Sequence, residues 1–134
     1  MDGHVRAFAF FGGVPQSVLY DNDRCLVSKI LADGTRKRAT LFSALQSHYL
    51  LRDRYGRPGK GNDKGKVEGI VGYARRNFMV PIPRSPSWDA VNAGLEAQCR
   101  KRQNDVLRGH KETIGERLQR DLAAMKPLPG APFE

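Results

Sequence analysis

The stretch "RAFAFFGGVPQSVLYDN", residues 6–22, changes from a helical to an extended pattern within a few positions. Apolar side chains recur up to residue 11 and stop at two glycines, which predicts a buried helix over residues 2–13 with a glycine cap at its end. The run after the proline predicts a short strand over residues 17–21, because a turn-prone Asp-Asn-Asp sequence follows it. A helix that leads directly into a strand favours an α/β architecture.

Strands and helices continue to alternate along the chain. Residues 25–31 and 50–55 predict two more short strands. The apolar positions between them predict a helix that buries Leu41, Phe42, Leu45 and Tyr49. Two or three strands are few for an independent α/β domain.

Helical patterns dominate the second half of the chain. The first of these helices begins near Lys64, and its apolar stripe consists of Val67, Ile70, Val71, Ala74 and Phe78. After a proline-rich linker, Ser87 is a candidate N-cap for a helix over residues 87–103 that packs through Trp88 as a core anchor. A last helix is predicted over residues 112–125.

The composition is that of an ordinary globular chain with an unusual charge. Of the 134 residues, 40% are hydrophobic and 28% are charged, and the formal net charge is +9. This surplus favours a polyanionic partner, nucleic acid before an anionic membrane, although a generic solubility surface is the alternative. The two cysteines are too few for a zinc cluster or a disulfide framework, which favours a reduced, cytoplasmic setting, and no apolar run is long enough to span a membrane.

The stretch "RPGKGNDKGKVEG", residues 57–69, is rich in glycine and positive charge. A nucleotide-binding P-loop needs four residues between its glycines and a hydroxyl after its lysine. Here three residues separate Gly61 from Gly65, and Val67 follows Lys66, so a P-loop is excluded. The stretch is either a phosphate-handling loop or an ordinary loop before a helix.

Two carboxylates stand out near these basic residues. Helical spacing places Glu68 on one face with Lys64, Gly72 and Arg75, beside the apolar stripe, and Gly72 leaves room for a large group to approach. A metal-binding glutamate beside a nucleic-acid backbone suits these surroundings, but a plain ion pair with Lys64 is the alternative. Asp21, at the end of a strand, supplies the second carboxylate of a two-metal phosphoryl-transfer arrangement.

Several segments together resemble a known family. "GHVRAFAFFGGVPQSVLYDN", "SHY", "RPGKGNDKGKVEGIVGYARRNFMVPIP" and "PLPGAPFE" resemble the IstA-type insertion-sequence transposases, which belong to the retroviral-integrase-like group with a ribonuclease H-like fold. The resemblance implies that Asp21 and Glu68 are the second and third members of an Asp-Asp-Glu triad that binds Mg²⁺ or Mn²⁺. It also implies DNA as the partner, with an ATPase helper and a homo-oligomer as further partners. The candidate nucleic-acid-binding residues are Arg57, Lys60, Asn62, Lys64, Lys66, Arg75 and Arg76.

One departure from the family pattern decides what we expect of this chain. The first catalytic aspartate of the family lies on a strand that precedes the first helix, and only Asp2 stands upstream here. We therefore expect a partial ribonuclease H-like fold that lacks its first three strands and is truncated at both ends. Its expected parts are a partial catalytic core at 1–80, a helical extension at 81–126 and a proline-rich extended tail at 127–134.

Three hypotheses about function stay open. The first is a fragment of a transposase or integrase catalytic domain, for which strand transfer by this chain alone is expected to be undetectable. The second is a non-enzymatic, basic nucleic-acid-binding or regulatory remnant of a mobile element. The third is a metal-independent structural domain. A second copy of the chain could also pair with the unpaired edge of the Asp21 strand.

Overall fold

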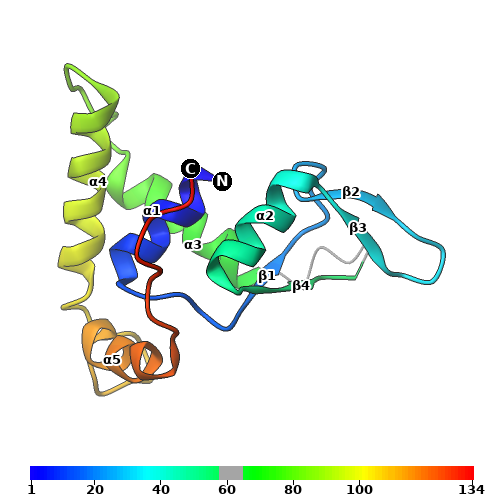
Figure 1. Cartoon of the computed structure of the whole chain (residues 1–134). Helices are drawn as coiled ribbons and strands as arrows, with labels where there is room; N and C mark the ends of the chain where they lie inside the picture. Colours follow the sequence, from blue (N-terminus) through cyan, green and yellow to red (C-terminus); the bar gives the residue numbers. More distant parts are fainter. Residues whose placement is uncertain (58–64) are drawn as a thin grey trace. The chain divides into compact units, whose positions relative to one another are not determined.

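The computed structural model of the chain describes residues 1–57 and 65–134 (Figure 1). The chain divides into two compact units, one formed by Met1–Asp63 with Asp121–Glu134 and the other by Lys64–Arg120. The first unit combines helices and strands, whereas the described part of the second is helical. The predicted α/β architecture is therefore confirmed.

The first unit begins with helix α1, Asp2–Phe11, which ends as the sequence predicts. Gly12 has a φ of 72°, in the left-handed region, and its N–H donates to the carbonyl groups of Phe8 and Ala9. Glycine adopts this conformation without the clash that a Cβ would introduce. The helix therefore stops at Gly12, and the chain turns toward the first strand.

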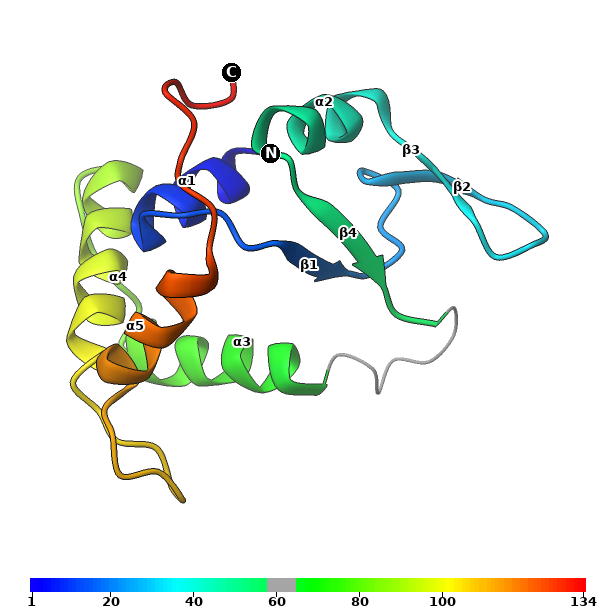
Figure 2. The ribbon, with the colours of Figure 1, turned by 60° about the horizontal axis from the view of Figure 1, so that its bottom comes forward.

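A parallel pair of strands forms the centre of the first unit. Strand β1, Ser17–Tyr20, pairs with β4, Arg52–Tyr55, so that Ser17 lies opposite Arg52 and Tyr20 lies opposite Tyr55. Figure 2 shows the two strands side by side and running in the same direction. Parallel strands need a crossover connection. Helix α2, Thr40–Tyr49, lies within this connection.

An antiparallel hairpin is inserted between β1 and α2. Its strands are β2, Val27–Ile30, and β3, Arg36–Arg38. The strand β3 was not predicted, because its sequence Arg-Lys-Arg lacks the apolar alternation that marks a strand. Pairing with β2 and the turn around Asp33 produce it, since the Asp33 carboxylate accepts hydrogen bonds from the N–H and hydroxyl of Thr35.

The hydrophobic core of the first unit lies between its helices and the parallel pair. It consists of Phe8, Val14, Tyr20, Phe42, Leu45, Tyr49 and Leu51. Aromatic rings meet edge to face, with ring centroids 4.9 Å apart for Phe8 and Tyr49 and 5.2 Å apart for Tyr20 and Phe42. The helical face predicted for residues 41–49 is thus largely confirmed, although Leu41 itself is exposed.

The second unit contains helix α3, Gly65–Phe78, helix α4, Trp88–Arg102, and most of α5, Ile114–Ala124. Ser87 caps α4 as predicted, since its hydroxyl accepts the Ala90 N–H at 3.1 Å. Two packing predictions were wrong: the core anchor Trp88 is 83% exposed, and Val67 and Ile70 on the α3 stripe are 55% and 69% exposed. The helical period was correct, but period alone does not say whether another element covers an apolar stripe.

Candidate catalytic carboxylates and basic residues

Asp21 lies directly after β1, at the carboxyl end of the parallel pair. The adjoining residue of the other strand is Gly56, whose N–H donates to the Tyr20 carbonyl at 3.2 Å and extends the pairing by one step. In α/β proteins, ligands bind outside the carboxyl ends of parallel strands. The structure therefore places Asp21 at an edge where a functional carboxylate is expected.

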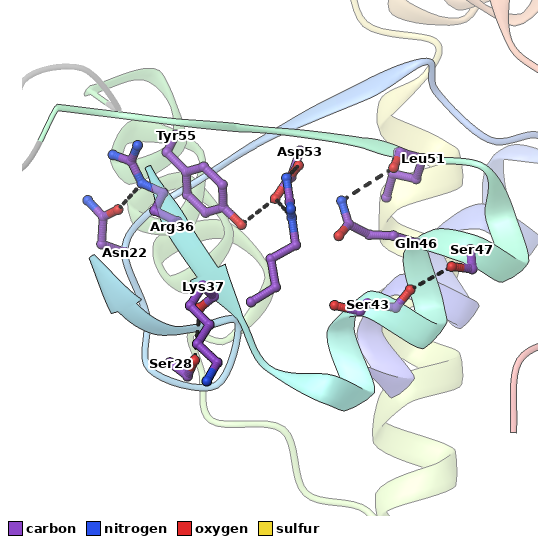
Figure 3. A network of polar contacts seen from close by, with 11 residues as sticks. Asn22, Ser28, Arg36, Lys37, Ser43, Gln46, Ser47, Leu51, Asp53 and Tyr55 are labelled. Carbon is purple, nitrogen blue, oxygen red and sulfur yellow. Dashed lines mark hydrogen bonds and ion pairs between the residues drawn. The ribbon is translucent and has the colours of Figure 1, made fainter. Parts of the chain in front are cut away.

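A guanidinium group from the hairpin reaches this edge (Figure 3). Arg36 Nε donates to Asn22 Oδ1 at 2.8 Å, and Arg36 Nη2 donates to the Gly56 carbonyl at 3.2 Å. The Asn22 side-chain amide reaches the same Gly56 carbonyl at 3.5 Å. These contacts connect the segment after β1, the segment after β4 and the strand β3.

A second network fastens the hairpin to β4. Arg38 donates to both carboxylate oxygens of Asp53, with Nη2 to Oδ1 at 2.7 Å, and the Tyr55 hydroxyl donates to Oδ2 at 2.6 Å. The Asp53 side chain is only 5% exposed, whereas that of Arg38 is 44% exposed. Burial acts to raise the pKa of Asp53, but the hydrogen bonds from Arg38 and Tyr55 outweigh it and lower this pKa to about 2. Burial, and next the hydrogen bond to Asp53, raise the pKa of Tyr55.

Glu68 lies in the first turn of α3 and is exposed. It belongs to the second unit, whereas Asp21 belongs to the first. The prediction that the two carboxylates belong to one metal-binding arrangement is therefore not tested by the structure and stays a prediction. The space predicted above Gly72 is taken by Arg76, whose Nη1 lies 3.1 Å from the position that a Cβ on Gly72 would occupy.

Four of the seven residues predicted to bind nucleic acid lie in the part of the chain that the structure describes. Arg57 is exposed beyond β4, and Lys66, Arg75 and Arg76 are exposed on α3. Lys60, Asn62 and Lys64 lie outside the described residues. The four described side chains are accessible to an anionic partner, but they are divided between the two units.

The described residues do not form a metal site by themselves. Among residues 1–57 and 65–134, no group of three His, Cys, Asp or Glu side chains could hold an ion. Carboxylate oxygens suit Mg²⁺. However, Asp21 and Glu68 supply only two such groups, from separate units. Within the same part of the chain, no helix is long and apolar enough to cross a membrane.

Sequence reasoning missed Arg36 and gave Asn22 no role. Arg36 is 14 positions from Asn22 and 20 from Gly56, so no local spacing connects them. The available signal was the Asp-Gly turn at residues 33–34, which indicates that the chain reverses direction and returns toward residue 22.

Comparison with known proteins places the chain among insertion-sequence transposases. No family model matches the sequence. A transposase from Aminobacter aminovorans is 35% identical over 99% of the chain, and the match covers 26% of that protein. The transposase for insertion sequence element IS21 from Pseudomonas aeruginosa is 37% identical over 97% of the chain, which covers 33% of that protein. A putative transposase from Sinorhizobium fredii is 32% identical over the whole chain and 26% of its own length.

The chain therefore spans about a quarter to a third of the length of the curated relatives that it matches. The match extends over nearly all of this chain, including the segments around Asp21 and Glu68. By this homology, the chain belongs with the transposases of IS21-type insertion sequences.

Proposed function

We propose that this chain corresponds to part of the DNA-integrating catalytic core of an IS21-type transposase, with a ribonuclease H-like fold. The observation that supports this most is the position of Asp21 at the carboxyl end of a parallel strand pair in a chain homologous to transposases. In this proposal, Asp21 and Glu68 are two of three carboxylates of an Asp-Asp-Glu triad. The protein acts on DNA in the cytoplasm, with an ATPase helper and further copies of itself as partners.

The proposed triad needs a third carboxylate in addition to Asp21 and Glu68. The implied Mg²⁺ or Mn²⁺ ion needs several oxygen ligands, and the described residues do not bring three potential ligands together. We therefore expect the isolated chain to show no detectable DNA strand transfer. A longer protein in which this stretch is joined to the remaining transposase sequence is expected to be active.

A graft tests the role of the two carboxylates. The matching third of the Pseudomonas aeruginosa relative is replaced by this chain, and strand transfer of a labelled element end is measured. Asp21→Asn or Glu68→Gln is expected to lower the rate by about 10³-fold or more, equivalent to about 4 kcal/mol of lost transition-state stabilisation. Asp89→Asn, an exposed carboxylate on α4, serves as the control and should retain activity.

An active graft in which Asp21→Asn and Glu68→Gln both retain the full rate would contradict the proposed roles. Strand transfer by the isolated chain, abolished by Glu68→Gln, would show that the prediction of an incomplete triad is wrong. The graft therefore tests the roles of the two carboxylates, and the assay of the isolated chain tests whether its triad is incomplete.

A second candidate function is DNA binding without catalysis. It is favoured by the net charge of +9 together with the lack of a three-ligand group among the described residues. In this case Lys66, Arg75 and Arg76 on α3 bind phosphates. Binding should then weaken steeply with salt, because each neutralised phosphate of duplex DNA contributes about −0.9 to the slope of log K against log salt.

Fluorescence anisotropy with a labelled duplex tests this prediction. Arg75→Ala is expected to reduce the salt slope by about 1, while Lys111→Ala, an equal loss of charge elsewhere in the second unit, should change it little. Equal effects of the two substitutions would indicate that the binding depends on net charge and not on α3.

A further inference from the structure

The guanidinium group of Arg36 joins three separate segments of the first unit. Its Nε donates to Asn22 Oδ1 at 2.8 Å, its Nη2 to the Gly56 carbonyl at 3.2 Å and its Nη1 to the Gly34 carbonyl at 2.9 Å. The guanidinium carbon also lies 4.7 Å from the centroid of the Tyr55 ring. A planar group with five N–H donors can make these contacts simultaneously, whereas the single ammonium of lysine cannot reach three such separated acceptors.

These contacts fix the backbone on both sides of Asp21. On one side, the Tyr20 carbonyl is held by the N–H that follows β4. On the other side, Asn22 is held by Arg36, and the Asp23 carboxylate accepts a backbone N–H two residues further on at 2.7 Å. The segment that carries Asp21 is therefore held on both sides of this residue.

The hairpin therefore has a specific connection to the edge at which Asp21 lies. Without Arg36, the segment after β1 would keep the strand pairing and the direct contact of the Asn22 amide with the Gly56 carbonyl at 3.5 Å. It would lose its link to β3 and the contacts of the guanidinium group with Asn22 and Gly56. A functional carboxylate must be held within a fraction of an ångström of its productive position, by neighbours that are themselves locked. The Arg36 contacts provide such support from outside the parallel pair.

We propose that Arg36 is a positioning residue that holds the Asp21 backbone at the carboxyl end of β1 through Asn22 and Gly56. The importance of this for catalysis rests on the proposed function of Asp21. The positioning itself is a property of the chain and does not depend on DNA or a metal ion.

The test uses the full ¹⁵N-labelled chain without DNA or metal. Arg36→Lys keeps the charge but loses the planar fork, and Asn22→Ala removes the acceptor at the other end of the contact. For both variants, the order parameter of the Asp21 N–H is expected to fall from about 0.85 to below about 0.6. Hydrogen-exchange protection of the Gly56 N–H should fall about tenfold.

Two references separate positioning from a general loss of stability. The Arg52 N–H donates to the Gln16 carbonyl at the opposite end of the same strand pair and should keep its protection within about twofold. Lys37→Ala, which truncates the adjacent residue of β3, should leave the order of Asp21 unchanged. Unchanged order at Asp21 in both Arg36→Lys and Asn22→Ala, or equal losses of protection at Gly56 and Arg52, would overturn the proposal.

The outcome is independent of the proposed function. Asp21→Asn removes the carboxylate that the graft experiment tests and should leave the protection of Gly56 intact. If the graft shows no role for Asp21, the Arg36 measurements still decide whether the guanidinium holds this segment. If Arg36 fails its own test, the role of Asp21 is still judged by the graft.

Discussion

At the residue scale, Asp53 and Asp2 show how burial changes the contribution of an ion pair. Both carboxylates bind an arginine, Asp53 with Arg38 and Asp2 with Arg6 at 2.8 Å. The side chains of the second pair are 65% and 77% exposed, so water screens it. The Asp53 side chain is only 5% exposed and also accepts the Tyr55 hydroxyl, so its charge depends on these partners.

We predict that Asp53→Asn lowers the free energy of unfolding by about 1–3 kcal/mol at pH 7, because a charged hydrogen-bond acceptor is lost. The folded-state pKa of Asp53 is about 2, below the ordinary value of 3.8. The stabilisation is therefore fully present above pH 3.8 and lost as the pH falls through 2. Denaturant unfolding at several pH values measures the difference between the two proteins.

The matched control is Asp2→Asn, which removes a similar contact on the surface and should cost no more than about 0.5 kcal/mol. A difference between wild type and Asp53→Asn that persisted unchanged below pH 2 would contradict the assigned pKa shift.

At the element scale, helices α4 and α5 both begin with a side-chain cap. Ser87 caps α4, as its hydroxyl accepts the Ala90 N–H. Before α5, the Thr113 hydroxyl accepts the Glu116 N–H at 3.1 Å and the Glu116 carboxylate accepts the Thr113 N–H at 2.8 Å, which is a capping box. Neither helix contains a fully buried residue, so local hydrogen bonds make a large contribution to where they begin.

We predict that Ser87→Ala lowers the free energy of unfolding of the second unit by about 1 kcal/mol, because the first turn of α4 loses its side-chain acceptor. Denaturant unfolding followed by helical circular dichroism measures this loss. Ser85→Ala, the same change in the preceding irregular segment, should stay within about 0.5 kcal/mol of the wild type. Equal effects of the two substitutions would argue against the cap.

At the scale of the whole molecule, the C-terminal residues return to the first unit. Val14 and Lys126 form a two-way backbone bridge, with N–H···O distances of 2.9 Å and 2.8 Å. Nearer the end of the chain, the Phe133 N–H donates to the Tyr49 hydroxyl at 3.3 Å, and the Phe133 ring centroid lies 5.7 Å from that of His48. The tail after Lys126 contains no helix or strand, and its contacts with α2 join it to the core of this unit.

We predict that Phe133→Ala lowers the free energy of unfolding of the first unit by about 1–2 kcal/mol, less than for a fully buried phenylalanine because the ring is only half-buried. Leu128→Ala removes an exposed apolar side chain of the same tail and should cost less than about 0.5 kcal/mol. Near-ultraviolet circular dichroism, which reports on aromatic packing, follows the unfolding. Equal losses in the two variants would contradict a specific docking of Phe133.

Prediction from the sequence succeeded where the signal was local. The glycine stop after α1, the apolar face of α2 and the Ser87 cap depend on residues within a few positions of one another. Strand β3 and the exposure of Trp88 were not predictable in this way. The first depends on pairing with β2, and the second depends on whether another element covers the helix.

The sequence by itself determined the alternation of helices and strands, the ends of several helices and the relationship to IS21-type transposases. It also placed Asp21 at the end of a strand. Only the tertiary structure revealed that Arg36 holds the segment around Asp21 and that the tail packs on α2, because these contacts join residues from 14 to 84 positions apart. Helices and strands repeat with fixed side-chain periods, so neighbouring residues in the sequence are enough to predict them. Contacts between distant residues depend instead on how the folded chain brings its elements together.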